Sequence, residues 1–158
     1  MNSNYLKSLR IVYFALAMGI VFFLLMSLFL NSVNGPFSAT DLTPKERAPF
    51  LITLIVITGF IFMAYKAIFP KKLGIIKSLP TLDRKLVAWR ELNILQGALI
   101  EAPAFFATVL FLLLGLSVLL IWPLAGLVLF WLTQPTREKF VLEANLSLKE
   151  VEEFEKME

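Results

Sequence analysis

Apolar residues in this chain are grouped in long runs instead of recurring at the spacing of a soluble helix or strand. There are four runs: Ile11 to Leu30, Phe50 to Phe69, Leu92 to Gly115, and Leu116 to Leu132. Polar stretches separate the first three, and the fourth follows the third with almost no loop, which predicts a tight antiparallel hairpin. A helix of about 20 residues crosses a hydrocarbon layer about 30 Å thick. We therefore predict an all-α integral membrane four-helix bundle, with residues 1–158 forming a single transmembrane domain.

The first apolar run follows two basic residues, Lys7 and Arg10, a pattern that a secretory signal peptide also shows. A signal peptide has an apolar core of about 7–15 residues and then a cleavage site with small residues. The run here is longer, and Asn31 to Asn34 does not resemble such a site. We expect an uncleaved first span.

Composition supports a membrane environment and excludes several chemistries. The chain is 58% hydrophobic and 17% charged, whereas soluble domains have roughly 45–50% apolar and about 25% charged residues. Cysteine and histidine are absent from the sequence, which excludes disulfides, His-ligated haem, a typical zinc site and a His general base. No phosphate-binding motif or metal-ligand pattern occurs either. We expect no enzyme activity, no catalytic residue, no metal and no cofactor.

The basic residues predict the orientation in the membrane. Lys71 to Arg90 contains six basic residues and one acid, Asp83, and lies on the same side as Lys7, Arg10 and the tail. Basic residues mark the cytoplasmic side of a multi-span protein. We predict an inner (cytoplasmic) membrane location with both termini cytoplasmic and a cytoplasmic tail over residues 134–158. The basic pI of about 9.3 then indicates lipid headgroups as partners, and no nucleic acid.

Two amphipathic segments are expected outside the spans. In the central loop, Leu82, Leu86 and Trp89 form an apolar stripe, which predicts a short interfacial helix with Trp89 at headgroup depth. In the tail, Ser147 and Glu150 form a capping-box pattern, and Leu148, Val151 and Phe154 share one face. This pattern predicts a C-terminal amphipathic helix that covers this protein or a partner, and the alternative is a frayed, solvated tail. The residues expected at lipid headgroups or at the interface are Lys71, Lys72, Lys77, Arg84, Lys85, Trp89 and Arg90.

The third run contains one acid, Glu101, about 14 Å beyond Leu92 along the helix axis. Insertion of a charged acid at this depth costs about 2.5–3.5 kcal/mol, so we expect a neutral carboxyl group that is hydrogen-bonded. Small and polar residues share its helix face and predict an intramembrane polar stripe that packs on a neighbouring helix. Pro103 predicts a helix kink, and Gln96 points about 140° away from Glu101, toward a different neighbour. The stripe consists of Asn93, Gly97, Glu101, Ala104 and Thr108.

Glu101 has two possible roles. In the first, its carboxyl group donates a hydrogen bond to Thr53, Thr58 or Ser27 on a facing span, and the protein is a non-catalytic structural or accessory subunit. Such a subunit packs against itself or a larger membrane complex, so its partners are membrane lipids and a membrane protein or a homo-oligomer. In the alternative, Glu101 carries ions in a proton- or cation-coupled translocation component. A third, weaker hypothesis is a lipid-surface adaptor that works through Lys71 to Arg90.

The segment Gln96 to Thr108, QGALIEAPAFFAT, resembles the carboxylate-bearing helix of rotary ATPase proteolipids. Those hairpins also have a glycine-repeat helix and a short polar loop, both of which this chain lacks, so the ion-binding role is not carried over. The whole layout, with its Glu-Ala-Pro span and the exit Pro135 to Lys139, resembles uncharacterised small four-span bacterial inner-membrane proteins. That resemblance implies a fold and a topology but no activity.

Overall fold

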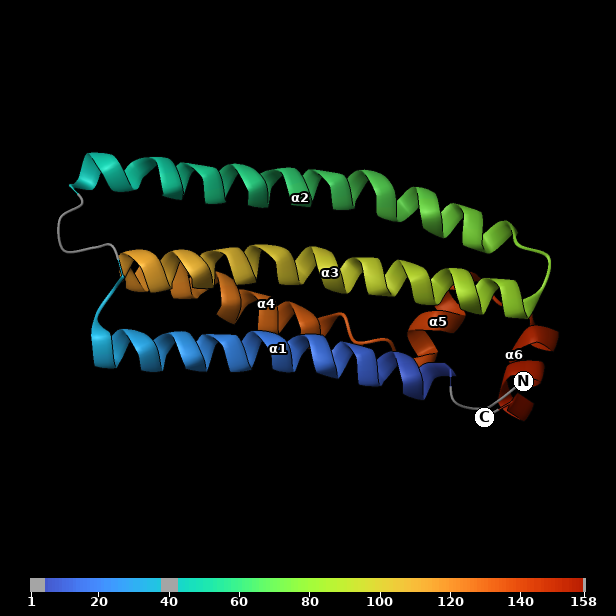
Figure 1. Cartoon of the computed structure of the whole chain (residues 1–158). Helices are drawn as coiled ribbons and strands as arrows, with labels where there is room; N and C mark the ends of the chain where they lie inside the picture. The colour runs from blue at the N-terminus through green and yellow to red at the C-terminus, as the bar shows by residue number, and fades with distance from the viewer. Residues whose placement is uncertain (1–4, 38–42, 158) are drawn as a thin grey trace.

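The computed structural model describes residues 5–37 and 43–157, which are entirely helical apart from short connections (Figure 1). Part of the predicted loop after the first span, residues 38–42, therefore lies outside the described residues. The helices are α1 (Tyr5–Asn34), α2 (Pro44–Ser78), α3 (Leu82–Leu114), the 3-10 helix η1 (Ser117–Leu120), α4 (Ile121–Leu132), α5 (Arg137–Ala144) and α6 (Leu148–Met157).

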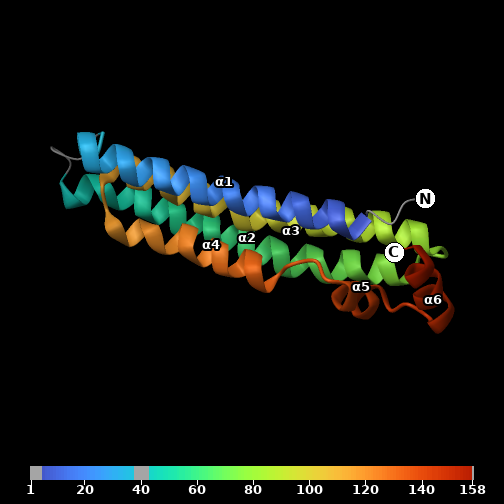
Figure 2. The same cartoon turned by 90° about the horizontal axis from the view of Figure 1, so that it is seen from below.

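Three helices are long and apolar enough to cross a membrane: Leu6–Asn34 of α1, the whole of α2, and the whole of α3. Residues Ser117–Leu132 (η1 with α4) and α5 are bent by 78° at their junction. If they form one broken span, the chain has a fourth crossing. The chain is thus an all-α, multi-pass membrane protein, as its apolar runs predict. Helices α1 to α4 run along a common axis in two perpendicular views (Figure 1, Figure 2).

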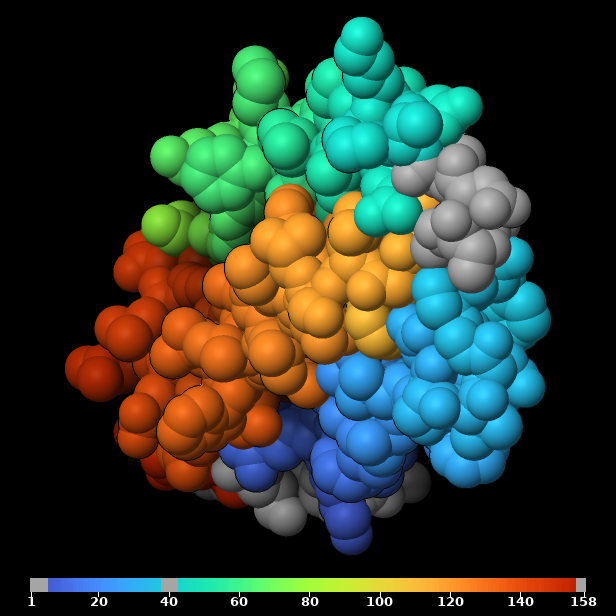
Figure 3. Space-filling model, turned by 90° about the vertical axis from the view of Figure 1, so that its left-hand side faces the viewer, coloured from blue at the N-terminus to red at the C-terminus, as the bar shows by residue number. Residues whose placement is uncertain are grey.

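Helix α3 is the central element of the bundle. It packs against α1, α2 and α4, and it contributes more buried residues than any other described helix. Helix α2 lies at one edge, and the end view shows it as a separate layer beside α3 and α4 (Figure 3). Its buried residues are Leu54 near one end and Ile76 near the other. The middle of α2 therefore contributes little to the core.

Helix α2 extends beyond the predicted second span at both ends. Helix α2 includes both Pro49 and Pro70 and continues to Ser78, because a proline removes a single amide hydrogen bond and packing on either side can hold the helix together. The last turns of α2 are held by Ile76, which is buried in the main core. Helix α2 therefore includes Lys71, Lys72 and Lys77, which the sequence predicts in the central loop.

The predicted separate interfacial helix was wrong. Residues 82–91 form the first turns of α3, which runs without a break into the predicted third span. The stripe of Leu82, Leu86 and Trp89 is buried against protein, so its amphipathic pattern reflects a tertiary contact instead of a membrane surface.

The connection between α3 and α4 is the tight hairpin that the sequence predicts. Gly115 ends α3 with φ +66°, a left-handed conformation that favours glycine, and its amide donates to the Phe111 carbonyl at 2.8 Å. A Cβ atom at this position would lie 2.9 Å from Cγ of Pro36. Glycine thus allows both the turn and the close approach of the chain that follows α1.

The two short helices α5 and α6 cover one end of the bundle, where α1 and α3 begin and α2 ends (Figure 1). We call α5, α6 and the residues that they bury the cap. At its centre the Phe140 ring lies 5.0 Å from the Trp89 ring and 5.3 Å from the Phe154 ring, centre to centre. The prediction that the C-terminal helix covers another part of this protein is confirmed, although Leu148 on its expected apolar face is 86% exposed.

Candidate functional site

The predicted polar stripe on α3 faces the protein's own α1 and α4. A Cβ atom on Gly97 would lie 2.9 Å from Cδ1 of Leu16 on α1 and 3.5 Å from Cε1 of Phe130 on α4. Further along the stripe, Cβ of Ala104 would lie 3.2 Å from a Cβ on Gly126 of α4. Small residues on both sides therefore allow the three helix backbones to approach closely.

The polar members at the two ends of the stripe bond mainly within their own helix. The Asn93 side chain is fully buried, and its Nδ2 donates to the Trp89 carbonyl at 2.8 Å. Thr108 Oγ1 donates to the Ala104 carbonyl at 2.8 Å. One bond crosses between helices, from the Tyr13 hydroxyl on α1 to the Asn93 backbone carbonyl at 3.0 Å. These residues stabilise the bundle.

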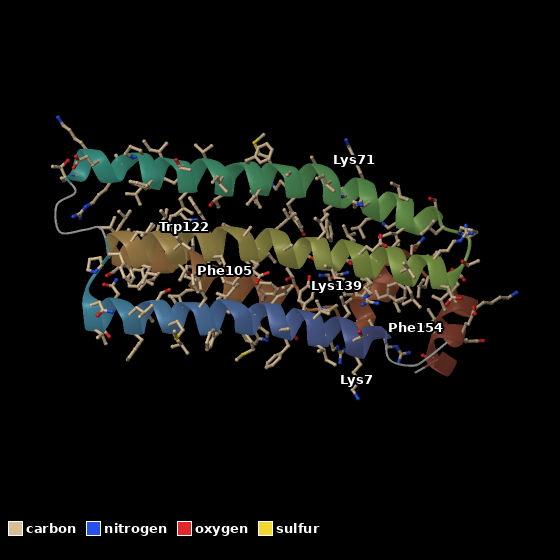
Figure 4. All side chains as sticks on the ribbon, in the orientation of Figure 1. Lys7, Lys71, Phe105, Trp122, Lys139 and Phe154 are labelled. Carbon is tan, nitrogen blue, oxygen red and sulfur yellow. The ribbon has the colours of Figure 1, made fainter. Side chains whose placement is uncertain are left out.

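Glu101 has a different environment from the rest of the stripe. Its Oε1 lies 3.5 Å from the position of a Cβ on Gly19 of α1, and the carboxylate is half-buried. Phe105, one turn further along α3, packs on Phe23 of α1 with ring centres 5.2 Å apart, and it lies between the two helices (Figure 4). Within residues 5–37 and 43–157, the Glu101 carboxylate has no hydrogen bond or ion pair.

The predicted hydrogen-bond partners of Glu101 were wrong. Thr58 Oγ1 donates to the Leu54 carbonyl at 2.7 Å and accepts from Trp122 Nε1 at 3.0 Å. Thr53 is exposed on α2, and Ser27 is buried on α1 but makes no bond to the acid. Eight residues of α1, more than two helical turns, separate Ser27 from the position that faces Glu101, which is Gly19.

A cavity of about 350 Å³ lies between α2, α3 and α4, on the side of α3 away from Glu101. The expectation that Gln96 serves a different neighbour is confirmed, because its Nε2 donates to the Tyr65 hydroxyl of α2 at 3.2 Å. Pro103, the predicted kink, lies in unbroken helix and also faces this cavity. The lining residues are Thr58, Ile61, Phe62, Tyr65, Gln96, Leu99, Ile100, Pro103, Ile121, Trp122, Ala125, Gly126, Leu129 and Thr133.

Two of the predicted headgroup residues belong to the cap instead. The Lys85 ammonium lies 2.7 Å from the Glu150 carboxylate, and Trp89 Nε1 donates to Glu143 Oε2 at 2.7 Å. Because the Lys85 ammonium and the Ser147 backbone amide donate to its carboxylate, the pKa of Glu150 is lowered from the ordinary 4.5.

The other predicted headgroup residues are accessible. Lys71, Lys72, Lys77 and Arg84 are exposed, and Arg90 is half-exposed. Lys71 points away from the bundle, as does Lys7 on α1, whereas Lys139 lies within the basic end (Figure 4). These exposed cations can contact lipid phosphates. Within the described ranges, no group of three or more acidic side chains is arranged to hold a metal ion.

Comparison with known proteins found no matching family model, no similar curated protein and no similar solved structure. The resemblance to small four-span inner-membrane proteins therefore stays a prediction. Two features of the described membrane-spanning part bear on function. These are the half-buried Glu101 carboxylate between α1 and α3, and the cavity between α2, α3 and α4.

Proposed function

We propose that this protein is a non-catalytic accessory subunit of the bacterial inner membrane that binds a transmembrane helix of another membrane protein. The binding surface is the α1–α3 seam, which we define as Gly19 and Phe23 of α1 with Ala98, Glu101 and Ala102 of α3. This proposal rests on the Glu101 carboxylate, which has no hydrogen bond or ion pair among the described residues. In this arrangement the chain crosses the membrane four times, with both termini on the cytoplasmic side.

Charge supports that orientation. On α2, Arg47 and Lys66 are 19 residues apart, which corresponds to roughly 28 Å of helix and matches the hydrocarbon thickness. Beyond Lys66, the end of the bundle with the cap has most of the lysine and arginine residues, as expected for the cytoplasmic side. Helix η1 and α4 together cover residues 117–132, roughly 24 Å, and make the short fourth crossing.

Glu101 supports a protein partner at the seam. The group lies in the middle of α3, five residues or roughly 8 Å beyond Gln96 along the helix axis, within the membrane-spanning part. A polar group that faces lipid without a hydrogen bond is unfavourable, and in membrane proteins polar side chains of other helices usually provide that hydrogen bond. Ala98 and Ala102 beside it are exposed and small, so a second helix can approach the α3 backbone closely. The partner helix then supplies the missing hydrogen bond.

A different protein fits the seam better than a second copy of this chain. A symmetric pair of seams would bring two Glu101 carboxyl groups together, and these can bond to each other only while at least one of them keeps its proton. A partner helix with a hydroxyl, amide or basic side chain has no such restriction. A homodimer is therefore an alternative outcome of the test below.

Ion translocation has less support from the geometry. A carrier carboxylate needs polar groups or water that connect it to both membrane surfaces. Glu101 Oε1 faces Gly19, which offers no side-chain donor or acceptor, and within the described residues no side chain bonds to the carboxylate. The decisive measurement is ion flux in reconstituted vesicles with Glu101→Gln. A loss of flux in that variant would favour the carrier over the accessory subunit.

The accessory role is tested by site-specific photo-crosslinking in the native membrane. A photoreactive amino acid at Ala102 should form an adduct with one membrane protein, and the attached peptide should come from a transmembrane helix. The matched control is Val56, which is equally exposed to lipid but lies on α2, and it should give no such adduct. Glu101→Leu should reduce the Ala102 adduct severalfold, while Glu101→Gln, which keeps the hydrogen bonding, should retain it. An adduct with a second copy, or with lipid alone, would overturn the proposal.

A further inference from the structure

We infer that the cavity between α2, α3 and α4 binds a lysophospholipid, with its single chain among the apolar side chains and its free hydroxyl on the Gln96 amide. This site lies on the other side of α3 from the α1–α3 seam and does not depend on the proposed partner. We call it the chain cavity. Its lining, volume, polar end and charge together specify this ligand class.

The lining selects a hydrocarbon chain. The chain cavity lies within the membrane-spanning part of the bundle, and apolar side chains make up most of its wall. Three of them, Phe62 on α2 with Ile121 and Leu129 on α4, are also exposed at the protein surface, so the cavity opens between α2 and α4. The medium at that opening is the lipid tail region, from which a chain can enter sideways without crossing water.

The volume selects one chain. The chain cavity holds about 350 Å³, which is at the lower limit of ligand pockets, roughly 300–1,000 Å³. Its α4 wall extends from Ile121 to Thr133, twelve residues or roughly 18 Å. A narrow, elongated space of this kind fits one extended chain better than the two chains of an ordinary phospholipid. Trp122, bonded to Thr58 of α2, closes the far end.

The polar end selects a hydroxyl group. Gln96 is 3% exposed, and while its Nε2 donates to the Tyr65 hydroxyl, its Oε1 has no partner. A buried amide oxygen without a hydrogen bond requires a donor. A hydroxyl group both donates and accepts, so it satisfies the free side of the Gln96 amide in either of its two orientations.

Charge at the same end selects a phosphate beyond that hydroxyl. Thr133 marks the inner end of the chain cavity, and its carbonyl accepts from Lys139 Nζ at 3.1 Å. Lys66 on α2 is exposed, but its ammonium lies over the Phe62 ring, 4.8 Å from the ring centre, and so belongs to the apolar wall. Glu143, 4.0 Å from Lys139, offsets part of the Lys139 charge but already accepts the Trp89 indole. The order along the site is therefore apolar wall, amide, then the Lys139 ammonium. A lysophospholipid has the matching order of chain, glycerol hydroxyl and phosphate.

The binding test uses the full chain in nanodiscs of diacyl phosphatidylcholine. The probe is a lysophosphatidylcholine with a brominated chain, which should quench Trp122 fluorescence saturably in a Trp131→Phe background, where Trp89 in the cap is the one other tryptophan. A brominated alkyl phosphocholine of equal length has the chain and the phosphate but lacks the glycerol hydroxyl. It should bind about fivefold more weakly, which corresponds to one hydrogen bond.

Two variants locate the site. Ala125→Phe places a ring in the chain cavity, where Ala125 is part of the wall, and should abolish saturable quenching. Ala102→Phe on the opposite side of α3 is the matched control and should leave it unchanged. Gln96→Leu should bind both probes equally. The inference would be overturned if the wild type bound the two probes with equal affinity. It would also be overturned if a brominated diacyl lipid quenched equally, or if Ala125→Phe left the quenching intact.

Discussion

The ammonium group of Lys85, in the first turn of α3, lies 2.7 Å from the carboxylate of Glu150 on α6, and 6% of the Lys85 side chain is exposed. The two residues are 65 positions apart in the sequence, so this ion pair joins the C-terminal helix to the start of the central span. Surface ion pairs contribute a median of about 0–1 kcal/mol to stability. Because the lysine is buried, we expect this pair to contribute more than that. It is the main polar contact that holds α6 in the cap.

Removal of the acid should release α6. In Glu150→Gln the buried Lys85 ammonium loses its counter-charge, which should destabilise the docked helix by about 1–3 kcal/mol. Limited proteolysis of the tail, followed by mass spectrometry, measures the release. Lys149→Gln, at an exposed neighbouring position, is the control and should be cut at the wild-type rate. Equal rates for both variants would show that the Lys85–Glu150 pair does not hold α6.

Acid should have the same effect as that variant. The pKa of Glu150 is lowered from 4.5 in the folded cap, chiefly by the Lys85 hydrogen bond. A lowered carboxyl pKa gives stability that is fully present above the ordinary value and is lost as the pH falls through the lower, folded value. Docking of α6 should therefore be constant from about pH 8 to pH 5 and weaken below about pH 4.5.

Fluorescence of Trp89 reports this change, because its ring packs on Phe140, which in turn packs on Phe154 of α6. The acid transition should be absent in Glu150→Gln, in which the titrating group is gone. A transition of equal size in that variant would assign the acid sensitivity to another carboxylate.

Helix packing along the polar stripe should depend on the absence of a side chain at Gly97. A leucine there would overlap Leu16 of α1 and the Phe130 ring of α4, and such overpacking typically costs about 1–3 kcal/mol. Gly59 on α2 has no atom within 4 Å of a Cβ position, so Gly59→Leu is the matched control. Thermal unfolding in detergent should show a lower midpoint for Gly97→Leu alone. Equal midpoints would mean that α1 and α4 can move apart at low cost.

The spans were predictable from the sequence because the membrane acts on each segment separately. A run such as Phe50 to Phe69 must be helical and lipid-compatible whatever its neighbours are. The direction of Gln96 was predictable for a similar reason, since helical geometry alone places it away from Glu101. Expectations of this kind need no knowledge of which helices are adjacent.

The burial of Trp89 and Lys85 in the cap was mispredicted because it depends on contacts between distant parts of the chain. Trp89 has the amphipathic setting of an interfacial residue, and only the position of Phe140, 51 residues later, shows that protein covers it. The partner of Lys85 is likewise in the tail. For Glu101, the sequence indicated the depth and the helix face, but the partner span depends on rotation of α1, which places Gly19 opposite the acid.

The two buried residues of α2, Leu54 and Ile76, are 22 positions apart, roughly 33 Å of helix. Leu54 and Ile76 therefore act as two supports of α2. Between them, the stretch over the chain cavity is joined to the bundle by the hydrogen bonds from Gln96 to Tyr65 and from Trp122 to Thr58. Bending of this stretch changes the width of the cavity while both supports and the cap stay in place. Because Ile76 is one of the supports and belongs to the same core as Phe140, a disturbance of the cap on the water-facing side would alter how far α2 bows inside the membrane.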